Sequence, residues 1–167
     1  MNAMMPQPFD PAQDAGEFRG ALGSFVTGVT VVTTQTSDGP VAIVANSFAS
    51  VSLEPPLVLW SPAKASRRFP FFADAPHFAI HVLAADQRDV CTAIVQSMTA
   101  IKDIPMQRSA CGMPIIDGAL ATFECDLEMR HDAGDHVIVV GRVTKAHHRS
   151  GSPLVFHGGK YGMFQQS

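Results

Sequence analysis

Hydrophobic positions near the start of the chain follow two different spacings. Phe18, Leu22 and Phe25 recur four and three residues apart, which places them on one face of a short helix that begins after Asp14. In contrast, β-branched residues are dense in GVTVVTTQT (28–36) and VAIVANSF (41–48), which favours strands. The SDGP sequence between them is typical of a turn. The pattern therefore predicts a helix that ends at Gly28, followed by two paired strands.

The rest of the chain alternates apolar runs with turn and helix signals. Further strands are predicted at LVLWS (57–61), HFAIHVLA (77–84), ALATFECDLEMRHDA (119–133), DHVIVVGRVTKAHH (135–148) and in PLVFHGGKYGMF (153–164). A short helix with Pro70 near its start is predicted within AKASRRFPFFADA (63–75). A second helix is predicted over 86–98 with Asp86 as its cap. Residues 99–114 have mixed character and two prolines, so we expect an irregular loop there.

About six strands joined mainly by short turns, with two or three short helices, predict a mainly β fold. An antiparallel barrel is the simplest arrangement, because a doubly wound α/β sheet needs a helix after nearly every strand. Residues 1–13 contain three prolines and read as an extended lead-in. Residues 14–167 are then expected to form a single domain.

Composition narrows the class of protein. The 167 residues are 46% hydrophobic and 16% charged, with a net charge of −3, which fits a well-packed domain and argues against nucleic-acid binding. No apolar run approaches the roughly 18–20 residues of a membrane-spanning helix, and the first ten residues lack the features of a signal peptide. Three cysteines without a CxxC pair favour a reduced, cytoplasmic protein without a metal site.

One stretch, VANSFASVSLEPP (44–56), combines strand-like apolar residues with small polar ones. Continued strand alternation would place Asn46, Ser50 and Ser52 on one face together with Phe48. This pattern fits an edge strand with a solvated outer face. It equally fits the wall of a pocket for a flat heteroaromatic ligand, whose ring edge needs hydrogen-bond partners. Composition does not separate these interpretations.

Four segments in order along the chain resemble the flavin reductase-like, FMN-binding split-barrel family. They are FRGALGSFVTGVTVVTT, VANSFASVSLEPPLVLWSPAK, HFAIHVLAADQ and GALATFECDLEMRHDAGDHVIVVGRV, and PLVFHGGKYGMF matches the closing segment. The family includes the small reductase components of two-component flavin monooxygenases. The resemblance implies an antiparallel split β-barrel of Greek-key type with a few short flanking helices, assembled as a homodimer.

The resemblance also implies which residues bind the flavin. The isoalloxazine ring would be lined by Val44, Ala45, Asn46, Ser47, Ser50, Val51 and Ser52. The flavin phosphate would be held by Ser61, Pro62, Ala63, Lys64, Ser66 and Arg68, and cations with hydroxyl groups suit a phosphate dianion. Taken without the family, Lys64 and Arg68 also fit a solvated basic turn.

Asp135 and His136 match a family motif near the flavin, and the resemblance implies that His136 and Asn46 take part in catalysis. A histidine at the start of a strand also fits a purely structural role, and Asp135 fits a turn cap. Lys160 and Tyr161 fit either a cover over the pocket or a structural tail. The chain has no GxGxxG, P-loop or GxSxG motif.

The function implied is an NAD(P)H-dependent flavin reductase, an oxidoreductase that passes hydride from NADH or NADPH to FMN or FAD. Its reduced flavin would supply a separate monooxygenase component. Two alternatives stay open at this point. One is a flavoprotein with tightly bound FMN that reduces another acceptor, and the other is a non-catalytic flavin-binding module.

Overall fold

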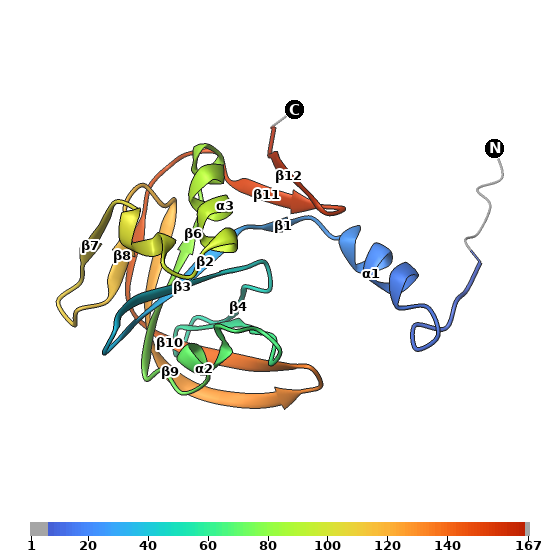
Figure 1. The fold of residues 1–167 in the computed structure, drawn as a ribbon, viewed down its shortest axis with the longest axis horizontal. Coiled ribbons are helices and arrows are strands. Elements are labelled where there is room, and N and C mark those ends of the chain that lie inside the picture. Colours follow the sequence, from blue (N-terminus) through green and yellow to red (C-terminus); the bar gives the residue numbers. More distant parts are fainter. Residues whose placement is uncertain (1–6, 166–167) are drawn as a thin grey trace.

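The computed structural model describes residues 7–165, and its centre is a seven-stranded antiparallel sheet (Figure 1). The strand order is β3-β2-β6-β9-β10-β5-β4. The strands are β2 (Thr30–Thr36), β3 (Gly39–Ala45), β4 (Ala49–Ser52), β5 (Leu57–Trp60), β6 (His77–Val82), β9 (Ala121–Ala133) and β10 (His136–His148). The mainly β, antiparallel fold is thereby confirmed.

Strands β3 and β4 form opposite edges of this sheet although only residues 46–48 separate them in sequence. Four residue steps span at most about 14 Å, whereas seven flat strands would set their edges about 29 Å apart. The sheet must therefore curl and twist until its two edges approach each other. Within residues 7–165 no backbone ladder joins β3 to β4, so the sheet is not closed.

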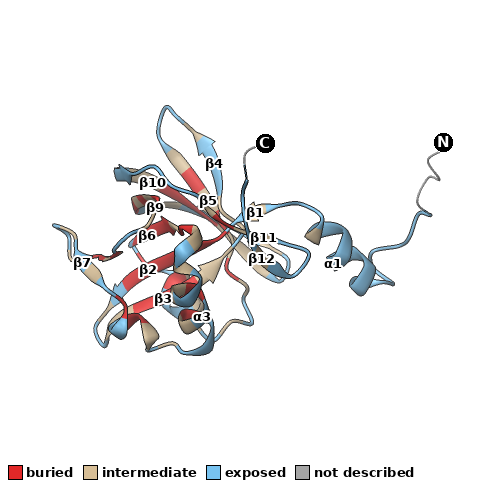
Figure 2. Cartoon of the chain, turned by 90° about the horizontal axis from the view of Figure 1, so that it is seen from above, coloured by how far each residue is buried: buried red, intermediate tan, exposed pale blue. Residues whose placement is uncertain are grey.

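Both faces of the sheet are covered, which explains why consecutive residues such as Val31 and Val32 are each fully buried. Val32 faces the inside of the curl, where Trp60, Phe72 and Phe78 form one apolar cluster. Helix α2 (Phe69–Ala73), with Pro70 in its first turn as predicted, contributes Phe72 to that cluster. The buried positions follow the central strands in Figure 2.

The other face of the sheet is covered by α3 (Arg88–Gln96) and the short η2 turn (Ala100–Asp103). Cys91 and Ile94 of α3 pack there with Val31 and Ile101. The predicted helix 86–98 is confirmed, but Asp86 is not its cap. Asp86 lies in a preceding 3-10 turn, η1 (Ala85–Gln87), where the side chain of Gln87 instead accepts a hydrogen bond from the Ala84 backbone at 3.0 Å.

Residues 99–114, predicted as an irregular loop, contain regular structure. Besides η2 they include β7 (Met106–Arg108), which pairs with β8 (Pro114–Ile116) as a small hairpin. The Ser109 hydroxyl accepts a hydrogen bond from the Met113 backbone at 3.1 Å and holds its turn. Each of these strands has only three residues. That is too short for an alternating pattern, so the sequence did not predict them.

The two ends of the chain come together beside the main sheet. Helix α1 (Ala15–Gly23) begins at Asp14 as predicted, and the Asp14 carboxylate accepts a hydrogen bond from the Glu17 backbone at 2.8 Å. Helix α1 ends at Gly23, not at Gly28. Gly28 lies instead in β1 (Thr27–Gly28), which forms a three-stranded sheet with β11 (Leu154–His157) and β12 (Lys160–Met163).

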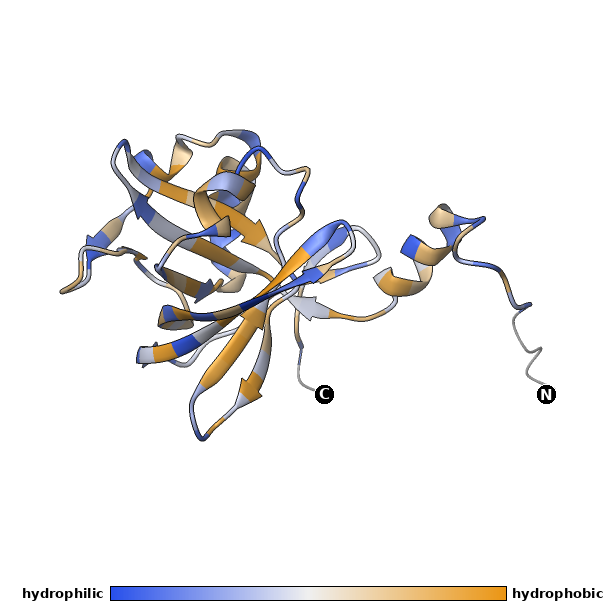
Figure 3. Ribbon diagram, turned by 90° about the horizontal axis from the view of Figure 1, so that it is seen from below, coloured by the Kyte–Doolittle hydropathy of each residue, from blue (hydrophilic) through white to orange (hydrophobic). Residues whose placement is uncertain are grey.

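Helix α1 contains no buried residue and lies outside the body of the molecule (Figure 2). Parts of its ribbon carry the orange of hydrophobic residues in Figure 3. The predicted lead-in, residues 1–13, lies partly outside the described part of the chain. Of its described residues, 7–10 form no regular element and 11–13 form a turn.

Candidate active site

Strand β3 ends at Ala45, and residues 46–48 leave the sheet to reach its opposite edge. Continued strand alternation from 41 to 53 is therefore wrong. The reason is a contact across the sheet edges: the Ser47 hydroxyl accepts a hydrogen bond from the Ser61 backbone at 2.9 Å. That contact ties the crossing segment to the end of β5.

A pocket of about 350 Å³ lies where this crossing segment meets the chain after β5 and the start of β10. Ten of the fifteen predicted ligand-binding residues line it: Val44, Ala45, Asn46, Ser47, Ser61, Pro62, Ala63, Ser66, Arg68 and His136. They come from three separate parts of the sequence. Folding thus brings the two predicted ligand-binding segments and the histidine to one place.

Five predicted residues do not line this pocket. Ser50, Val51 and Ser52 lie on β4, the outermost strand of the sheet, and the Val51 side chain is half exposed. Lys64 donates a hydrogen bond to the Gly134 carbonyl at 2.6 Å and forms an ion pair with Asp132. Asp135 lies exposed in the β9–β10 turn.

The segment 61–64 is fixed by backbone pairing with the start of β10. The Val137 backbone donates to the Pro62 carbonyl at 3.1 Å, and the Lys64 backbone donates to the Asp135 carbonyl at 2.9 Å. Ala63 and His136 form an isolated antiparallel bridge between these two contacts. The loop after β5 and the predicted catalytic histidine are therefore one rigid wall of the pocket.

The His136 imidazole is oriented by its neighbour in sequence. Nδ1 of His136 lies 2.7 Å from a carboxylate oxygen of Asp135, so Nδ1 carries the hydrogen. This hydrogen bond and the proximity of the imidazole hold the pKa of the Asp135 carboxyl below its usual value. The arrangement leaves Nε2 of His136 available for a ligand in the pocket.

Arg68 is the cation in the pocket wall. Its guanidinium donates to the Ile94 carbonyl in the last turn of α3, while Nε is buried and has no hydrogen-bond partner among the described residues. Burial lowers the pKa of Arg68 from its ordinary value. A buried donor without a partner is costly, and an anionic group of a ligand would satisfy it.

Several wall residues were not singled out in the sequence. Ile43 and Trp60 form the apolar floor of the pocket, and Val95 of α3 lines its side. Trp60 is 1% exposed and would be read as core from sequence alone. Val95 is 55% exposed, and an apolar helical position left uncovered is the one signal that could have identified it.

A smaller cavity of about 160 Å³ adjoins the pocket through Val44, Ala45 and Asn46. Its far wall is formed by Phe156 of β11 and Tyr161 of β12, whose rings lie 5.2 Å apart. The aromatic tail thus contributes to the site. Lys160, which precedes Tyr161 in the sequence, is exposed and does not line this cavity.

Tyr161 is held in place by contacts with α3. Its hydroxyl accepts a hydrogen bond from the Cys91 thiol at 3.3 Å, and the Arg88 guanidinium lies over its ring at 5.7 Å. The hydrogen bond with Cys91, together with burial, raises the pKa of Tyr161 to about 12. The phenol is therefore neutral at physiological pH.

Other kinds of site are not indicated in the described part of the chain. Between residues 7 and 165 no group of three His, Cys, Asp or Glu side chains could hold a metal ion. Over the same residues, none of the helices combines the length and apolar character that a membrane crossing needs.

The model of the family described as flavin reductase like domain matches residues 22–165. The chain belongs to this family. Among curated relatives it is 53% identical to FMN reductase (NADH) SmoA of Agrobacterium fabrum, over 92% of this chain and 88% of that one. It is 40% identical to the flavin-dependent monooxygenase reductase subunit HsaB of Rhodococcus jostii, over 90% and 78% of the two chains.

Solved structures of flavin reductases share the fold. NADH:FAD oxidoreductase SgcE6 of Streptomyces globisporus superposes with a TM-score of 0.90 at 34% identity, covering 99% of this chain and 95% of that one. The same protein is known in complex with NAD and FAD fragments, with a TM-score of 0.88, 34% identity and coverage of 96% and 98%.

The pocket fits a flavin. Its volume lies at the lower end of the roughly 300–1,000 Å³ of small-molecule sites. Its floor is apolar, and Asn46 and His136 are among the polar residues of its walls. The buried donor of Arg68 without a partner lies in the same wall. An apolar, planar ring system with polar edges and an anionic substituent matches this set of groups.

Proposed function

We propose that the protein is an NAD(P)H-dependent flavin reductase that transfers hydride from a nicotinamide to FMN or FAD. The observation that carries the proposal is the pocket in which Asn46, Arg68 and His136 come together. The relatives named FMN reductase (NADH) and reductase subunit of a flavin-dependent monooxygenase support it. By the same comparison, the reduced flavin would be used by a separate monooxygenase component.

The flavin, when bound, supplies the electron-accepting ring for hydride transfer, and the chain supplies position and environment. Asn46 has both a donor and an acceptor for the polar edge of the ring. Ser47 keeps Asn46 in place through its contact with Ser61. Val44 and Trp60 present apolar surface that excludes water from the ring.

His136 is proposed to contact the nicotinamide or the edge of the ring. Asp135 engages Nδ1 of His136, so Nε2 is the atom that faces a ligand. The bond to Asp135 also fixes the hydrogen-bonding role of Nε2. Asp135 acts through His136 and is a positioning residue in this proposal. The arrangement needs no further acid or base, because the reaction chiefly requires two rings to be held face to face.

We assign the flavin phosphate to Ser66 and Arg68, with Pro62 and Ala63 as backbone support. The Ser66 hydroxyl accepts a hydrogen bond from the Arg68 backbone at 3.2 Å, which keeps both side chains at one end of the pocket. Lys64 remains a proposed phosphate contact, but it would first have to exchange its bonds to Gly134 and Asp132.

Ser50, Val51 and Ser52 are kept as the outer part of the proposed ring-binding segment. They begin three residues after Ser47 and lie at the edge of the sheet, where β4 has a neighbour on one side only. A register shift between Ser50 and Ser52 against β5 lets this strand bend. Bending of that kind re-aims side chains beside binding sites.

Four further features belong to the proposal. The curled sheet is taken to be a split barrel of Greek-key type, and residues 14–167 are taken to be one domain. The exposed apolar face of α1 supports a homodimer. Free cysteines at positions 91, 111 and 125 are consistent with a reducing, cytoplasmic setting.

The test is steady-state oxidation of NADH and NADPH by the purified protein with FMN and with FAD. A colourless preparation that oxidises NADH only when flavin is added is the expected result. Asn46→Ala should lower kcat/KM for flavin about tenfold, because a hydrogen bond to the ring edge is lost. Gln96→Ala, an exposed amide at the end of α3, is the matched control.

The alternatives give different results in the same experiment. A yellow preparation that NADH bleaches without added flavin would indicate a tightly bound cofactor. A protein that binds flavin but is not reduced by either nucleotide would contradict the proposal and leave a non-catalytic binding module.

A further inference from the structure

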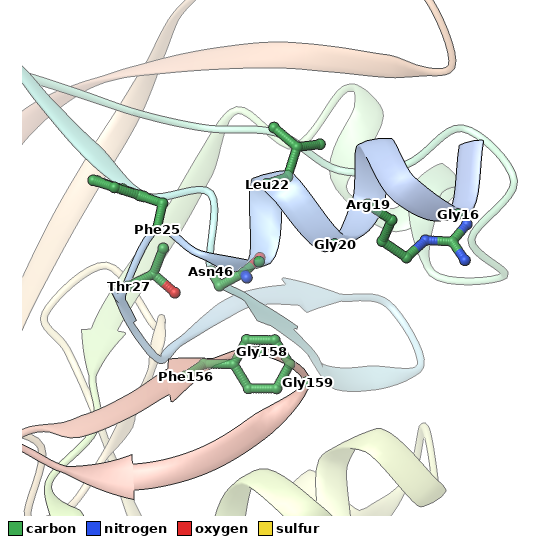
Figure 4. A pocket seen from close by; sticks show the side chains of 11 residues that line it. Gly16, Arg19, Gly20, Leu22, Phe25, Thr27, Asn46, Phe156, Gly158 and Gly159 are labelled. Carbon is green, nitrogen blue, oxygen red and sulfur yellow. The ribbon is translucent and has the colours of Figure 1, made fainter. Parts of the chain in front are cut away.

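A cavity of about 500 Å³ between α1 and the turn that joins β11 to β12 extends the candidate active site (Figure 4). Asn46 lines this cavity, the pocket beside His136 and the small cavity beside Tyr161. The three are therefore neighbouring parts of one groove, with Asn46 at their junction.

A separate cavity of about 280 Å³ lies between the β7–β8 hairpin, the start of β9 and the end of β10. It shares no lining residue with the pocket beside His136. Lys145 and His147 line it from the end of β10, whereas His136 begins that strand. Nine residue steps at about 3.3 Å each put roughly 30 Å between His136 and Lys145. Figure 1 also shows β7 and β8 on the opposite side of the molecule from α1.

This second cavity contains a buried carboxylate. The Glu124 side chain is 7% exposed and lines the cavity from β9. Within residues 7–165 the carboxylate has two long contacts, with Nε2 of His147 at 3.7 Å and with the Cys111 thiol at 3.9 Å. A thiol is a weak donor, and close charged pairs have distances of about 2.7–2.9 Å. Because a buried carboxylate without close donors is costly, Glu124 suits a ligand that brings donors to it.

Lys145 supplies an opposite charge beside Glu124. The two residues are direct partners in the ladder between β9 and β10, where Cβ atoms lie about 4.5–5.5 Å apart and side chains usually interact. Among the described residues, however, the ion pair of Glu124 is with His147 and not with Lys145. A register shift between Val143 and Lys145 accounts for this, because such shifts re-aim side chains.

The other Arg and Asp side chains of the cavity are already engaged within the protein. Arg108 donates to a glutamine side chain at 2.6 Å and to a backbone carbonyl at 2.9 Å. The Asp117 carboxylate accepts a hydrogen bond from the Gln107 amide at 3.0 Å. Glu124 and Lys145 are therefore the two opposite charges that a ligand in this cavity would meet.

We propose that this cavity binds a small zwitterion of the α-amino acid type, with its ammonium group on Glu124 and its carboxylate on Lys145. An ammonium group has three donors, and the Thr122 hydroxyl lies in the same wall as Glu124. Ile115 and Ala119 give apolar surface for a short side chain. The volume of about 280 Å³ lies just below the roughly 300–1,000 Å³ of drug-sized ligand sites, which fits a ligand of this size. The proposal does not depend on the proposed function.

The first test is titration calorimetry of the full chain with L-leucine and two analogues that each lack one charge. Isocaproate has the same carbon skeleton without the ammonium group, and isoamylamine has it without the carboxylate. The wild-type protein should bind L-leucine and bind each analogue about tenfold more weakly, because one charge-assisted contact is lost. Equal binding of all three compounds would show only an apolar cleft and would overturn the proposal.

The second test assigns each charge of the ligand to its partner. Glu124→Gln and Lys145→Met should each raise the dissociation constant for L-leucine about tenfold. Glu124→Gln should weaken binding of isoamylamine but not of isocaproate, and Lys145→Met should do the reverse. Glu17→Gln on α1 and Lys102→Met in η2, both at exposed positions, are the matched controls and should bind L-leucine like wild type.

Circular dichroism establishes that each variant is folded. Lys145 is exposed, so Lys145→Met keeps the proposal testable even if the buried Glu124→Gln variant fails to fold. Two results would overturn the proposal: no saturable binding of L-leucine by the wild-type protein, or a Lys145→Met variant that weakens isoamylamine as much as isocaproate.

Discussion

Asn46 shows how a single residue acquires its place from the fold. In the sequence it interrupts an apolar run, which fits a wet edge strand as well as a pocket. In the structure β3 ends one residue earlier, and Asn46 lies at the junction of three cavities. The deciding contact is the Ser47–Ser61 hydrogen bond, which joins residues fourteen positions apart and leaves no local signal.

The buried side chain of His81 affects the stability of the folded protein. It is completely buried in β6, its Nδ1 donates to the Val31 carbonyl at 3.0 Å, and Nε2 has no hydrogen-bond partner among the described residues. Burial lowers the pKa of His81 from 6.5 to about 4. The folded protein therefore keeps this imidazole neutral where the unfolded chain takes up a proton.

This shift predicts a pH-dependent free energy of unfolding. Above pH 6.5 neither state is protonated, so His81 adds no pH dependence. As pH falls from 6.5 towards 4, the unfolded chain binds a proton that the folded protein excludes, and stability declines by up to roughly 3 kcal/mol. Urea unfolding followed by fluorescence of Trp60, the sole tryptophan, should show this loss.

The control is His81→Gln, which keeps a donor for the Val31 carbonyl and cannot titrate. Its unfolding free energy should vary less between pH 6.5 and 4 than that of the wild type. Parallel pH profiles for the two proteins would show that other groups cause the acid sensitivity.

At the scale of elements, the backbone of β10 at Gly141 lies very close to the side chains of Phe78 in β6 and Cys125 in β9. A Cβ at this position would lie 2.6 Å from the Phe78 ring and 2.9 Å from the Cys125 Cβ. The ladder with β9 also shifts register between Val140 and Gly141. The glycine is therefore required by the packing of β10 on β6 and β9.

Gly141→Ala should lower the free energy of unfolding by about 1–3 kcal/mol, because Phe78 and the backbone must move apart. Phe78 packs on Trp60 with ring centroids 6.2 Å apart, so near-ultraviolet circular dichroism should change as well. Gly28→Ala is the control, since a Cβ there meets nothing within 4 Å. Equal stability of the two variants would show that the sheet absorbs the extra methyl group.

The elements that sequence could predict are those with strong local signals. The long strands β9 and β10, the hairpin of β2 and β3, and α1 with its Asp14 cap were all identified in this way. The hairpin of β7 and β8 was not, because three-residue strands carry no periodicity. Phe156 escaped assignment to the site, and Tyr161 was left open between a cover over the pocket and a structural tail, because only long-range pairing brings β11 and β12 beside β3.

At the scale of the whole molecule, the strand order explains how a site arises. Because β3 and β4 end as opposite edges of one sheet, the segment between them must cross an opening. That opening is bordered by the loop after β5, the start of β10 and the C-terminal strands. Residues from both ends and the middle of the chain thus meet where the sheet does not close.

Helix α1 packs weakly on the rest of the described chain, to which a hydrogen bond from the Gly158 backbone ties its last residue, Gly23. Its side chains Phe18 and Leu22 are 42% and 59% exposed, and no residue of the helix is buried. A nine-residue helix is shorter than the about 12–15 residues needed for marginal stability alone. A second copy of the chain, packing on this apolar face, would supply the missing contacts.

The expected outcome is a dimer in solution, with a light-scattering mass near twice the 17.9 kDa of the chain. Leu22→Arg should shift the mass to that of a monomer, because a buried unpaired charge at the interface is strongly unfavourable. Met129→Arg, at a half-exposed site on the β9–β10 hairpin, should remain dimeric. A wild-type mass near 17.9 kDa would contradict the dimer and show that the exposed face of α1 needs no second copy of the chain.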